Sequence, residues 1–325
     1  MTQPRLVIAG GARGLLPTGP SASRRRMPRW RKTEALTGWL FVSLPIVLFV
    51  VFGAYTIGYG FALSFASWNG LSPNWTWLGL GNYQAIFGGR GYVAKQLSDA
   101  FWVTLILTIS VPVLTVAISF PIALMLNSVR RVKSLLRTIY FLPYVTAGIA
   151  VVYAWRYVFD VDGALNTVLR AVGLGILAPK DGLLGSSATA LIGVIVLMVW
   201  AGVPLGILLY LTGLQTLDQS LFEAAAVDGA GRFQTSWHIV WPMLRPTTAL
   251  LIILNLKNAM QDFVTPMLMT NGGPFRSTTP LGLVAYNFAF GALKNLGYAS
   301  ALGWLLFAAG LILALINLRA GRRRD

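Results

Sequence analysis

Five polar or charged side chains interrupt an apolar stretch in the last third of the chain: Asn255, Lys257, Asn258, Gln261 and Asp262. Such groups are costly at membrane depth and normally face a bundle interior or a cavity. Amides both donate and accept hydrogen bonds, and a carboxylate accepts them. This set therefore suits the binding of a hydroxyl-rich molecule.

Helical spacing gathers several of these residues on one face. At 100° per residue, five side chains fall within about 80° of each other: Thr248, Asn255, Asn258, Asp262 and Thr265. We expect this stripe to line a solute route, with its two asparagines near mid-membrane. The alternatives are hydrogen bonds between helices or contact with a second subunit. Lys257 is expected to pair with Asp262 or with a partner chain.

Residues suited to catalysis are few. The chain has no Cys, one His and ten carboxylates, and it contains no G-x-x-x-x-G-K-[ST] loop for ATP. We expect His238 to be a surface or docking residue, because a metal site would need more ligands. Arg156 is expected to reach the membrane interface or to pair with Asp160. No catalytic residue, metal site or cofactor is predicted.

The composition predicts an all-α polytopic membrane protein. The chain has 325 residues, of which 56% are hydrophobic, and a mean hydropathy of +0.67. The net charge of +16 does not indicate a nucleic-acid partner, because the basic residues lack interleaved aromatic side chains and lie beside apolar runs. The arginines at the C-terminal end are expected to contact anionic lipid: Arg319, Arg322, Arg323 and Arg324.

Six apolar runs are long enough to cross about 30 Å of hydrocarbon as helices. We place them near 38–64, 100–127, 138–158, 189–213, 247–269 and 299–318. The predicted organisation is a mobile basic tail, a transmembrane domain that contains a loop at 215–246, and a short basic C-terminal tail: residues 1–35, 36–319 and 320–325.

The basic residues predict that both termini are cytoplasmic. With that orientation, the inside segments hold eighteen Lys and Arg residues and the outside segments hold six. Cytoplasmic segments of membrane proteins carry such an excess. The loop at 215–246 then also faces the cytoplasm.

A polar stretch within that loop, residues 223–246, has a pattern of its own, and we call it the knob. Ala and Glu favour a helix over 221–227, and Asp228-Gly229 then ends it, since Gly tolerates a positive φ. A second helix follows through Arg232, Phe233, Trp237 and Val240, with Pro242 and Pro246 at its end. The pattern predicts a small helix-turn-helix unit.

The knob resembles the "EAA" signature of permease subunits in binding-protein-dependent ATP-binding-cassette (ABC) importers, most closely the carbohydrate-uptake branch. The resemblance rests on Glu223-Ala224-Ala225, Asp228-Gly229-Ala230, Ile239, Pro242 and Pro246. Trp241 and Ser236 depart from the pattern, where that branch usually has Leu and often has Phe. Further segments between spans resemble the same branch, so the likeness covers about residues 36–319.

The resemblance implies a type I (MetI-like) importer permease in the bacterial inner membrane. It also implies a second permease, a homodimeric ATP-binding subunit, an extracytoplasmic solute-binding protein and a sugar substrate. The knob would dock into the ATPase. Glu223 would stabilise the start of the knob helix or pair with a basic partner residue, Ala224 and Ala225 would allow close approach, and Gly229 would permit the turn.

Three alternatives stay open at this stage. A permease of the glycerol-phosphate type belongs to the same branch. A secondary transporter would need ion-coupling carboxylates in its spans and usually related halves, but Asp262 is alone and no repeat is visible. A membrane-embedded enzyme would need clustered His or carboxylates near one face, which the sequence lacks.

Overall fold

The computed structural model describes residues 29–128, 133–146, 148–292 and 294–322. The chain divides into two compact units, Met1–Ile57 and Gly58–Asp325, which are described separately. The predicted tail at 1–35 lies mostly outside the described residues, and helix α1 begins at Arg29. The last residues of the predicted C-terminal tail, 323–325, also lie outside them.

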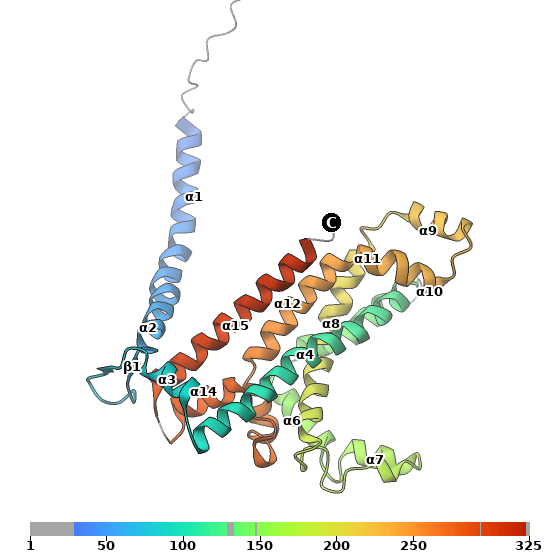
Figure 1. Cartoon of the computed structure of the whole chain (residues 1–325). Coiled ribbons are helices and arrows are strands. Elements are labelled where there is room, and N and C mark those ends of the chain that lie inside the picture. Colours follow the sequence, from blue (N-terminus) through green and yellow to red (C-terminus); the bar gives the residue numbers. More distant parts are fainter. Residues whose placement is uncertain (1–28, 129–132, 147, 293, 323–325) are drawn as a thin grey trace, which may run out of the picture. The chain divides into compact units, whose positions relative to one another are not determined.

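The first unit is helical throughout its described part (Figure 1). It contains α1 (Arg29–Leu48), the π-helix η1 (Phe49–Ala54) and the start of α2 (Tyr55–Leu63). Together they supply a candidate membrane span at Thr37–Leu63, close to the predicted run at 38–64.

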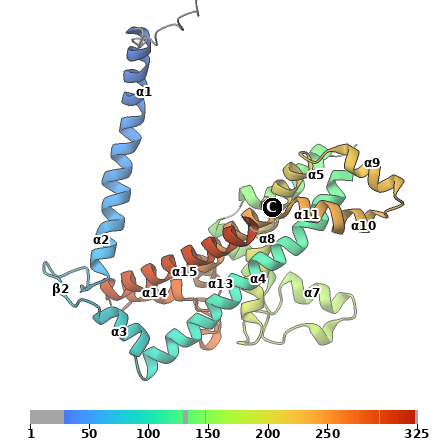
Figure 2. The same cartoon turned by 45° about the horizontal axis from the view of Figure 1, so that its top comes forward.

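The second unit is built around four long helices: α4 (Tyr92–Ser128), α8 (Ala190–Leu214), α12 (Arg245–Gln261) and α15 (Leu296–Arg322). Figures 1 and 2 show that α15 ends next to the start of α12. There the Asn317 amide donates to the Ala249 carbonyl at 3.2 Å. Glycines bring the helices close together, because a Cβ added at Gly206 in α8 would lie 2.6 Å from the Ser119 Oγ in α4.

Shorter elements complete the second unit. The knob end holds α9 (Gln219–Val227), α10 (Arg232–Thr235), the π-helix η3 (Ser236–Val240) and α11 (Trp241–Met243). The remaining elements are β1 (Ala66–Ser67), β2 (Thr76–Trp77), α3 (Gly81–Gly88), α5 (Lys133–Thr146), α6 (Ile149–Val158), α7 (Ala164–Ala171), η2 (Gly175–Leu177), α13 (Val264–Thr270), η4 (Pro274–Arg276) and α14 (Leu281–Phe290). The two strands pair antiparallel, Ala66 opposite Trp77.

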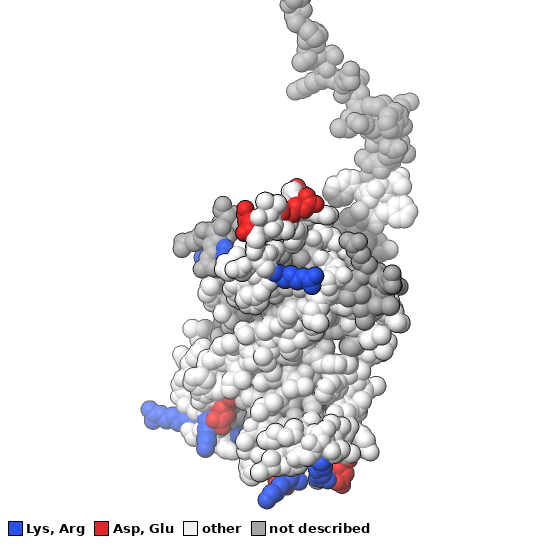
Figure 3. All heavy atoms as spheres, turned by 90° about the vertical axis from the view of Figure 1, so that its right-hand side faces the viewer, with Lys and Arg blue, Asp and Glu red and all other residues white. Residues whose placement is uncertain are grey.

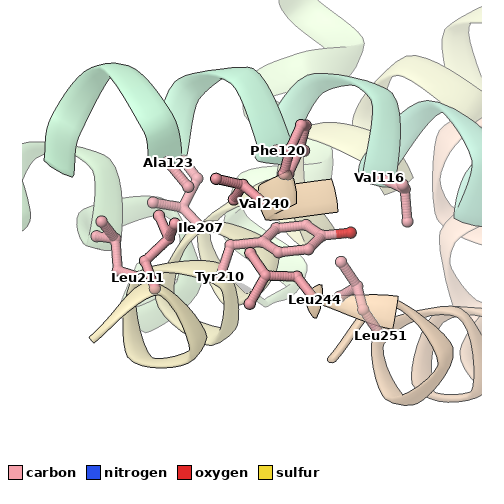
Figure 4. Close-up of a cluster of buried hydrophobic side chains, with 10 residues drawn as sticks. Val116, Phe120, Ala123, Ile207, Tyr210, Leu211, Val240, Leu244 and Leu251 are labelled. Atoms are coloured by element: carbon pink, nitrogen blue, oxygen red, sulfur yellow. The ribbon is translucent and has the colours of Figure 1, made fainter. Parts of the chain in front are cut away.

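A buried cluster joins α4, α8, the knob and α12 (Figure 4). Phe120 packs edge-to-face against Tyr210, with ring centroids 5.4 Å apart. The other buried members are Val116, Ala123, Ile207, Leu211, Leu214, Val240, Leu244 and Leu251. Val240 and Leu244 belong to the knob, so the cluster fixes the knob to the spans by burial of apolar surface.

Four of the six predicted spans are confirmed as helices that are long and apolar enough to cross a membrane. The other two are divided. The run at 138–158 forms α5 and α6, because the backbone is extended at Gly148 (φ 159°, ψ −175°), which is the N-cap of α6. The run at 247–269 forms α12 and α13, with α12 following the knob helices at a 69° bend.

The break after α12 has a local cause. Asp262 leaves the helix with an extended backbone, ψ 111°. Pro266 stands four residues later, and in a continuous helix its ring would clash with the Asp262 carbonyl. The prediction of one unbroken span here is therefore wrong.

One face of the second unit has an uncharged middle band (Figure 3). On the face shown in Figure 3, Lys, Arg, Asp and Glu gather toward its two ends, and the band between them is uncharged. This distribution is the one expected when the middle lies in hydrocarbon.

Candidate functional site

A cavity of about 560 Å³ lies among α6, α8, α12 and α13. The four predicted route residues Asn255, Asn258, Asp262 and Thr265 all line it. The remaining lining residues are Val111, Tyr144, Gly148, Ile149, Val151, Val152, Leu197, Met198, Trp200, Ala201, Gly202, Leu205, Lys257, Ala259, Gln261 and Val264. The structure thus brings together amides, a carboxylate, an ammonium and two aromatic rings in a mostly apolar enclosure.

Asn255 is the buried polar member of the cavity wall, with 7% of its surface exposed. Its Nδ2 donates to the Leu251 carbonyl one turn earlier at 2.9 Å. Its Oδ1 faces α8, where an added Cβ at Gly202 would approach it to 2.8 Å. Asn255 therefore packs between helices as well as lining the cavity.

Asn258 and Asp262 have different surroundings, although they lie one helical turn apart. Asn258 is exposed to the cavity, and its carbonyl accepts the Asp262 backbone N–H at 2.9 Å. The Asp262 Oδ1 accepts the backbone N–H groups of Val264 at 2.9 Å and Thr265 at 3.0 Å. Asp262 thus satisfies two donors at the start of α13 that the helix itself leaves unpaired.

The predicted continuous stripe is wrong in two respects. It is interrupted at Asp262, so Thr265 reaches the cavity from a separate helix. Thr248 does not line the cavity, and its Oγ1 hydrogen-bonds the Tyr210 hydroxyl at 3.0 Å. That contact between α8 and α12 is the helix-to-helix hydrogen bonding that the sequence left open as an alternative.

Two ion pairs that the sequence offered as possibilities along the spans are absent from the described residues. Within the described part of the chain, neither Lys257 with Asp262 nor Arg156 with Asp160 is an ion pair within 4.0 Å. Asp160 instead accepts the Val161 backbone N–H at 2.6 Å. Among the described residues, no group of three or more His, Asp or Glu side chains could hold a metal ion.

The knob has the predicted helix-turn-helix form. Helix α9 ends as the Asp228 N–H bonds the Ala224 carbonyl at 3.0 Å and the Ala230 N–H bonds the Ala225 carbonyl at 2.9 Å. Gly229 takes the left-handed conformation that the turn requires, φ +76°. The second helix runs from Arg232 through η3 to Met243, and Pro242 lies in the first turn of α11.

The start of α9 rules out one of the two roles expected for Glu223, and its pairing with a basic partner residue stays a prediction. The helix begins at Gln219, so Glu223 lies in its middle, and Asp218 occupies the N-cap with its side chain accepting the Ser220 N–H at 3.0 Å. This hydrogen bond lowers the pKa of the Asp218 carboxyl. Helix-forming residues predicted α9, but the cap was missed, and its signal is an Asp directly before the helix.

The knob presents apolar side chains to its surroundings. Val227 is 88% exposed and Phe233 is 80% exposed. Glu223 and Ala224 are also exposed, whereas Ala225 is buried within this chain and so serves internal packing. His238 is exposed, and its Nδ1 lies 3.2 Å from the Gln234 carbonyl.

An aromatic row connects the knob surface to the spans. Trp237 stacks on Trp241 with centroids 5.6 Å apart, and Trp241 packs edge-to-face on Phe120 at 4.8 Å. Phe120 in turn contacts Tyr210. Trp241, which departs from the usual Leu, thus joins a continuous packed path from the exposed knob to the core.

Two aromatic cavity residues were missed by sequence reasoning. Tyr144 comes from α5 and Trp200 from α8, and Trp200 packs edge-to-face on Trp155 at 5.4 Å. Helix α8 is apolar on all sides, so its sequence does not indicate which face meets a cavity.

Several apolar helices of spanning length, a cavity that gathers polar side chains and a helical knob are features expected of a membrane transport component. Residues 115–322 match the family described as "Binding-protein-dependent transport system inner membrane component". The chain belongs to this family. It is a multi-pass protein of the bacterial plasma membrane with a type I (MetI-like) permease fold.

Curated relatives are similar over most of their length. The chain is 34% identical over 288 residues to the multiple sugar-binding transport system permease protein MsmF of Streptococcus mutans, covering 88% of this chain and 95% of the relative. It is 31% identical over 318 residues to the diacetylchitobiose uptake system permease protein NgcF of Streptomyces coelicolor, covering 92% and 89%.

A solved structure supports the fold. One chain of a bacterial ABC transporter involved in the import of the acidic polysaccharide alginate superposes with a TM-score of 0.70 at 22% identity. The superposition covers 91% of this chain and 99% of that chain. At this identity the likeness shows the fold alone.

Proposed function

We propose that this chain is the permease subunit of an ATP-driven importer of a sugar or oligosaccharide. It would form the translocation path together with a second permease and receive the solute from an extracytoplasmic binding protein. A homodimeric ATPase would supply the energy through the knob. The chain itself then performs no catalysis.

The cavity is the observation that carries the proposal. Asn255, Asn258, Asp262 and Thr265 converge on a space of about 560 Å³ within the spans. Sugar hydroxyls need donors and acceptors to replace water, and amide and carboxylate groups provide both. The rings of Tyr144 and Trp200 offer flat apolar faces for the C–H side of a sugar.

The exposed surface of the knob supports coupling to an ATPase. Val227 and Phe233 leave apolar side chains without cover in a segment that follows a spanning helix. Exposed apolar surface rimmed by polar residues marks docking sites. Because the knob shares a buried cluster with α4 and α8, a rigid-body movement of the knob would move those helices too.

The names of the relatives support a carbohydrate as the solute. MsmF is named for multiple sugars and NgcF for diacetylchitobiose. We carry this class over to the present chain, in preference to glycerol phosphate or an ion-coupled secondary mechanism.

The proposal is tested by uptake into vesicles that contain the complete importer, using the labelled sugar that its binding protein retains. Asn258→Leu removes a cavity amide that makes no side-chain hydrogen bond in the described structure, and we expect uptake to fall about tenfold. Asn287→Leu is the matched control, because Asn287 is an exposed helical asparagine outside the cavity. Equal uptake by the two variants would contradict the proposed route.

A further inference from the structure

Lys257 places a cationic group in the cavity wall without an anionic partner. It lies on α12, and its side chain is exposed where it borders the cavity. We propose that Lys257 makes the cavity selective for saccharides that carry a carboxylate, such as uronic-acid sugars. This inference rests on the proposed function and specifies its substrate class.

The depth of Lys257 makes its charge consequential. It stands twelve residues after Arg245, the first residue of α12. At about 1.5 Å per residue, that separation is about 18 Å along the helix. Lys257 thus lies toward the end of α12 that is far from the knob, within a run predicted to span the membrane. A cation at such a depth requires water, a counter-charge or both.

The cavity supplies little counter-charge of its own. Among its lining residues the charged ones are Lys257 and Asp262, and they form no ion pair within 4.0 Å. The Asp262 Oδ1 already accepts two backbone N–H groups at 2.9 and 3.0 Å, which holds the carboxylate at the start of α13. One oxygen of the Asp262 carboxylate is thus used by its own backbone, and Lys257 forms no ion pair with it within 4.0 Å among the described residues, so the ammonium is open to a ligand.

The neighbours of Lys257 complete a site for a sugar acid. Asn258 and Gln261 place amides on the same helix for hydroxyl groups. Tyr144 and Trp200 border the same space with aromatic faces. An ammonium has three donors and forms charge-assisted hydrogen bonds with a carboxylate, about twice as strong as neutral ones. A uronate would use all three kinds of group, whereas a neutral sugar would leave the charge unpaired.

The test measures binding of two matched saccharides, digalacturonate and galactobiose, to the purified pair of permeases in nanodiscs by calorimetry. We expect wild type to bind digalacturonate at least tenfold more tightly. Lys257→Gln should remove this preference, and Lys257→Arg should retain it. Lys180→Gln is the control, because Lys180 lies in the connection between α7 and α8 and does not line the cavity.

Each contrary outcome has a distinct meaning. If wild type binds both saccharides equally, the cavity is a saccharide site but the role given to Lys257 is wrong. If Lys257→Gln lowers the thermal stability of the pair without changing selectivity, Lys257 pairs with a carboxylate of the second permease, and the inference is again overturned. If neither saccharide binds, the saccharide route itself fails, and the inference fails with it.

Discussion

Gly206 offers the sharpest test of how closely the helices pack. A Cβ at this position would lie 2.6 Å from the Ser119 Oγ, 2.7 Å from the Ser119 Cβ and 3.1 Å from the Leu251 Cδ2. Ser119 is fully buried. Gly206→Ala must therefore separate α8 from α4 or force both helices to shift.

The expected cost follows from two opposing effects. Overpacking a close-packed site costs about 3 kcal/mol at its upper range. Replacing Gly by Ala inside a helix returns about 1 kcal/mol. We expect Gly206→Ala to lower the free energy of unfolding by about 2 kcal/mol, measured by circular dichroism during SDS titration in mixed micelles.

A control and a rescue make this prediction specific. Gly303→Ala adds the same methyl group in α15, where nothing lies within 4 Å, so it should cause no loss. Ser119→Gly removes both atoms that the new methyl would meet, and the Ser119 hydroxyl has no hydrogen-bond partner among the described residues. The double variant should recover at least about 1 kcal/mol relative to additivity. Equal stabilities of Gly206→Ala and Gly303→Ala would refute the close packing.

Three further predictions concern local contacts. The hydrogen bond from the Ser220 N–H lowers the pKa of the Asp218 carboxyl, so this contact stabilises α9 above the ordinary Asp pKa and is lost as pH falls through the lowered pKa. Amide exchange in α9, corrected for intrinsic rates, should therefore become faster as pH falls through this range. Asp218→Ala should remove this dependence of exchange on pH. Tyr210→Phe removes the contact with Thr248 and should lower the free energy of unfolding by about 1 kcal/mol, and an unchanged value would mean that the hydroxyls do not bond. Asp262→Ala leaves two N–H groups at the start of α13 unpaired and should cost about 1 kcal/mol, whereas unaltered exchange there would contradict the capping role.

The long apolar runs could be located from sequence, because a span needs little more than length and apolarity. The helices at Thr37–Leu63 and Ala190–Leu214 lie within a residue of the predicted runs 38–64 and 189–213. The turn of the knob could also be predicted from sequence, because Asp228-Gly229 is a typical end of a helix. The sequence also carries a signal for the N-cap, namely Asp218 directly before α9, but the cap was not predicted.

The sequence predicted which polar residues of α12 and α13 line the cavity, but it did not predict how the backbone positions them. All four predicted route residues border it, yet the periodicity argument assumed a continuous helix, whereas α12 ends at Gln261 and Pro266 disfavours its continuation through Asp262. Tyr144 and Trp200 lie on other helices, α5 and α8. They line the same cavity because of tertiary packing, which the spacing of residues along the sequence does not reveal. Lys257 forms no ion pair with Asp262 within 4.0 Å in the described structure, so pairing with a partner chain, the other possibility that the sequence offered, stays a prediction.

The most direct test of the central proposal is co-purification of the tagged chain with its partners from native membranes. Wild type should recover an ATPase and a second permease. Glu223→Arg and Gly229→Pro, which alter the exposed face and the turn of the knob, should lose the ATPase and keep the second permease.

Asp99→Arg is the matched charge reversal, because Asp99 is an exposed helical carboxylate near the start of α4, far along the chain from the knob, and it should keep both partners. If wild type is recovered alone while its cells still accumulate the solute, the account of an ATP-driven permease is contradicted.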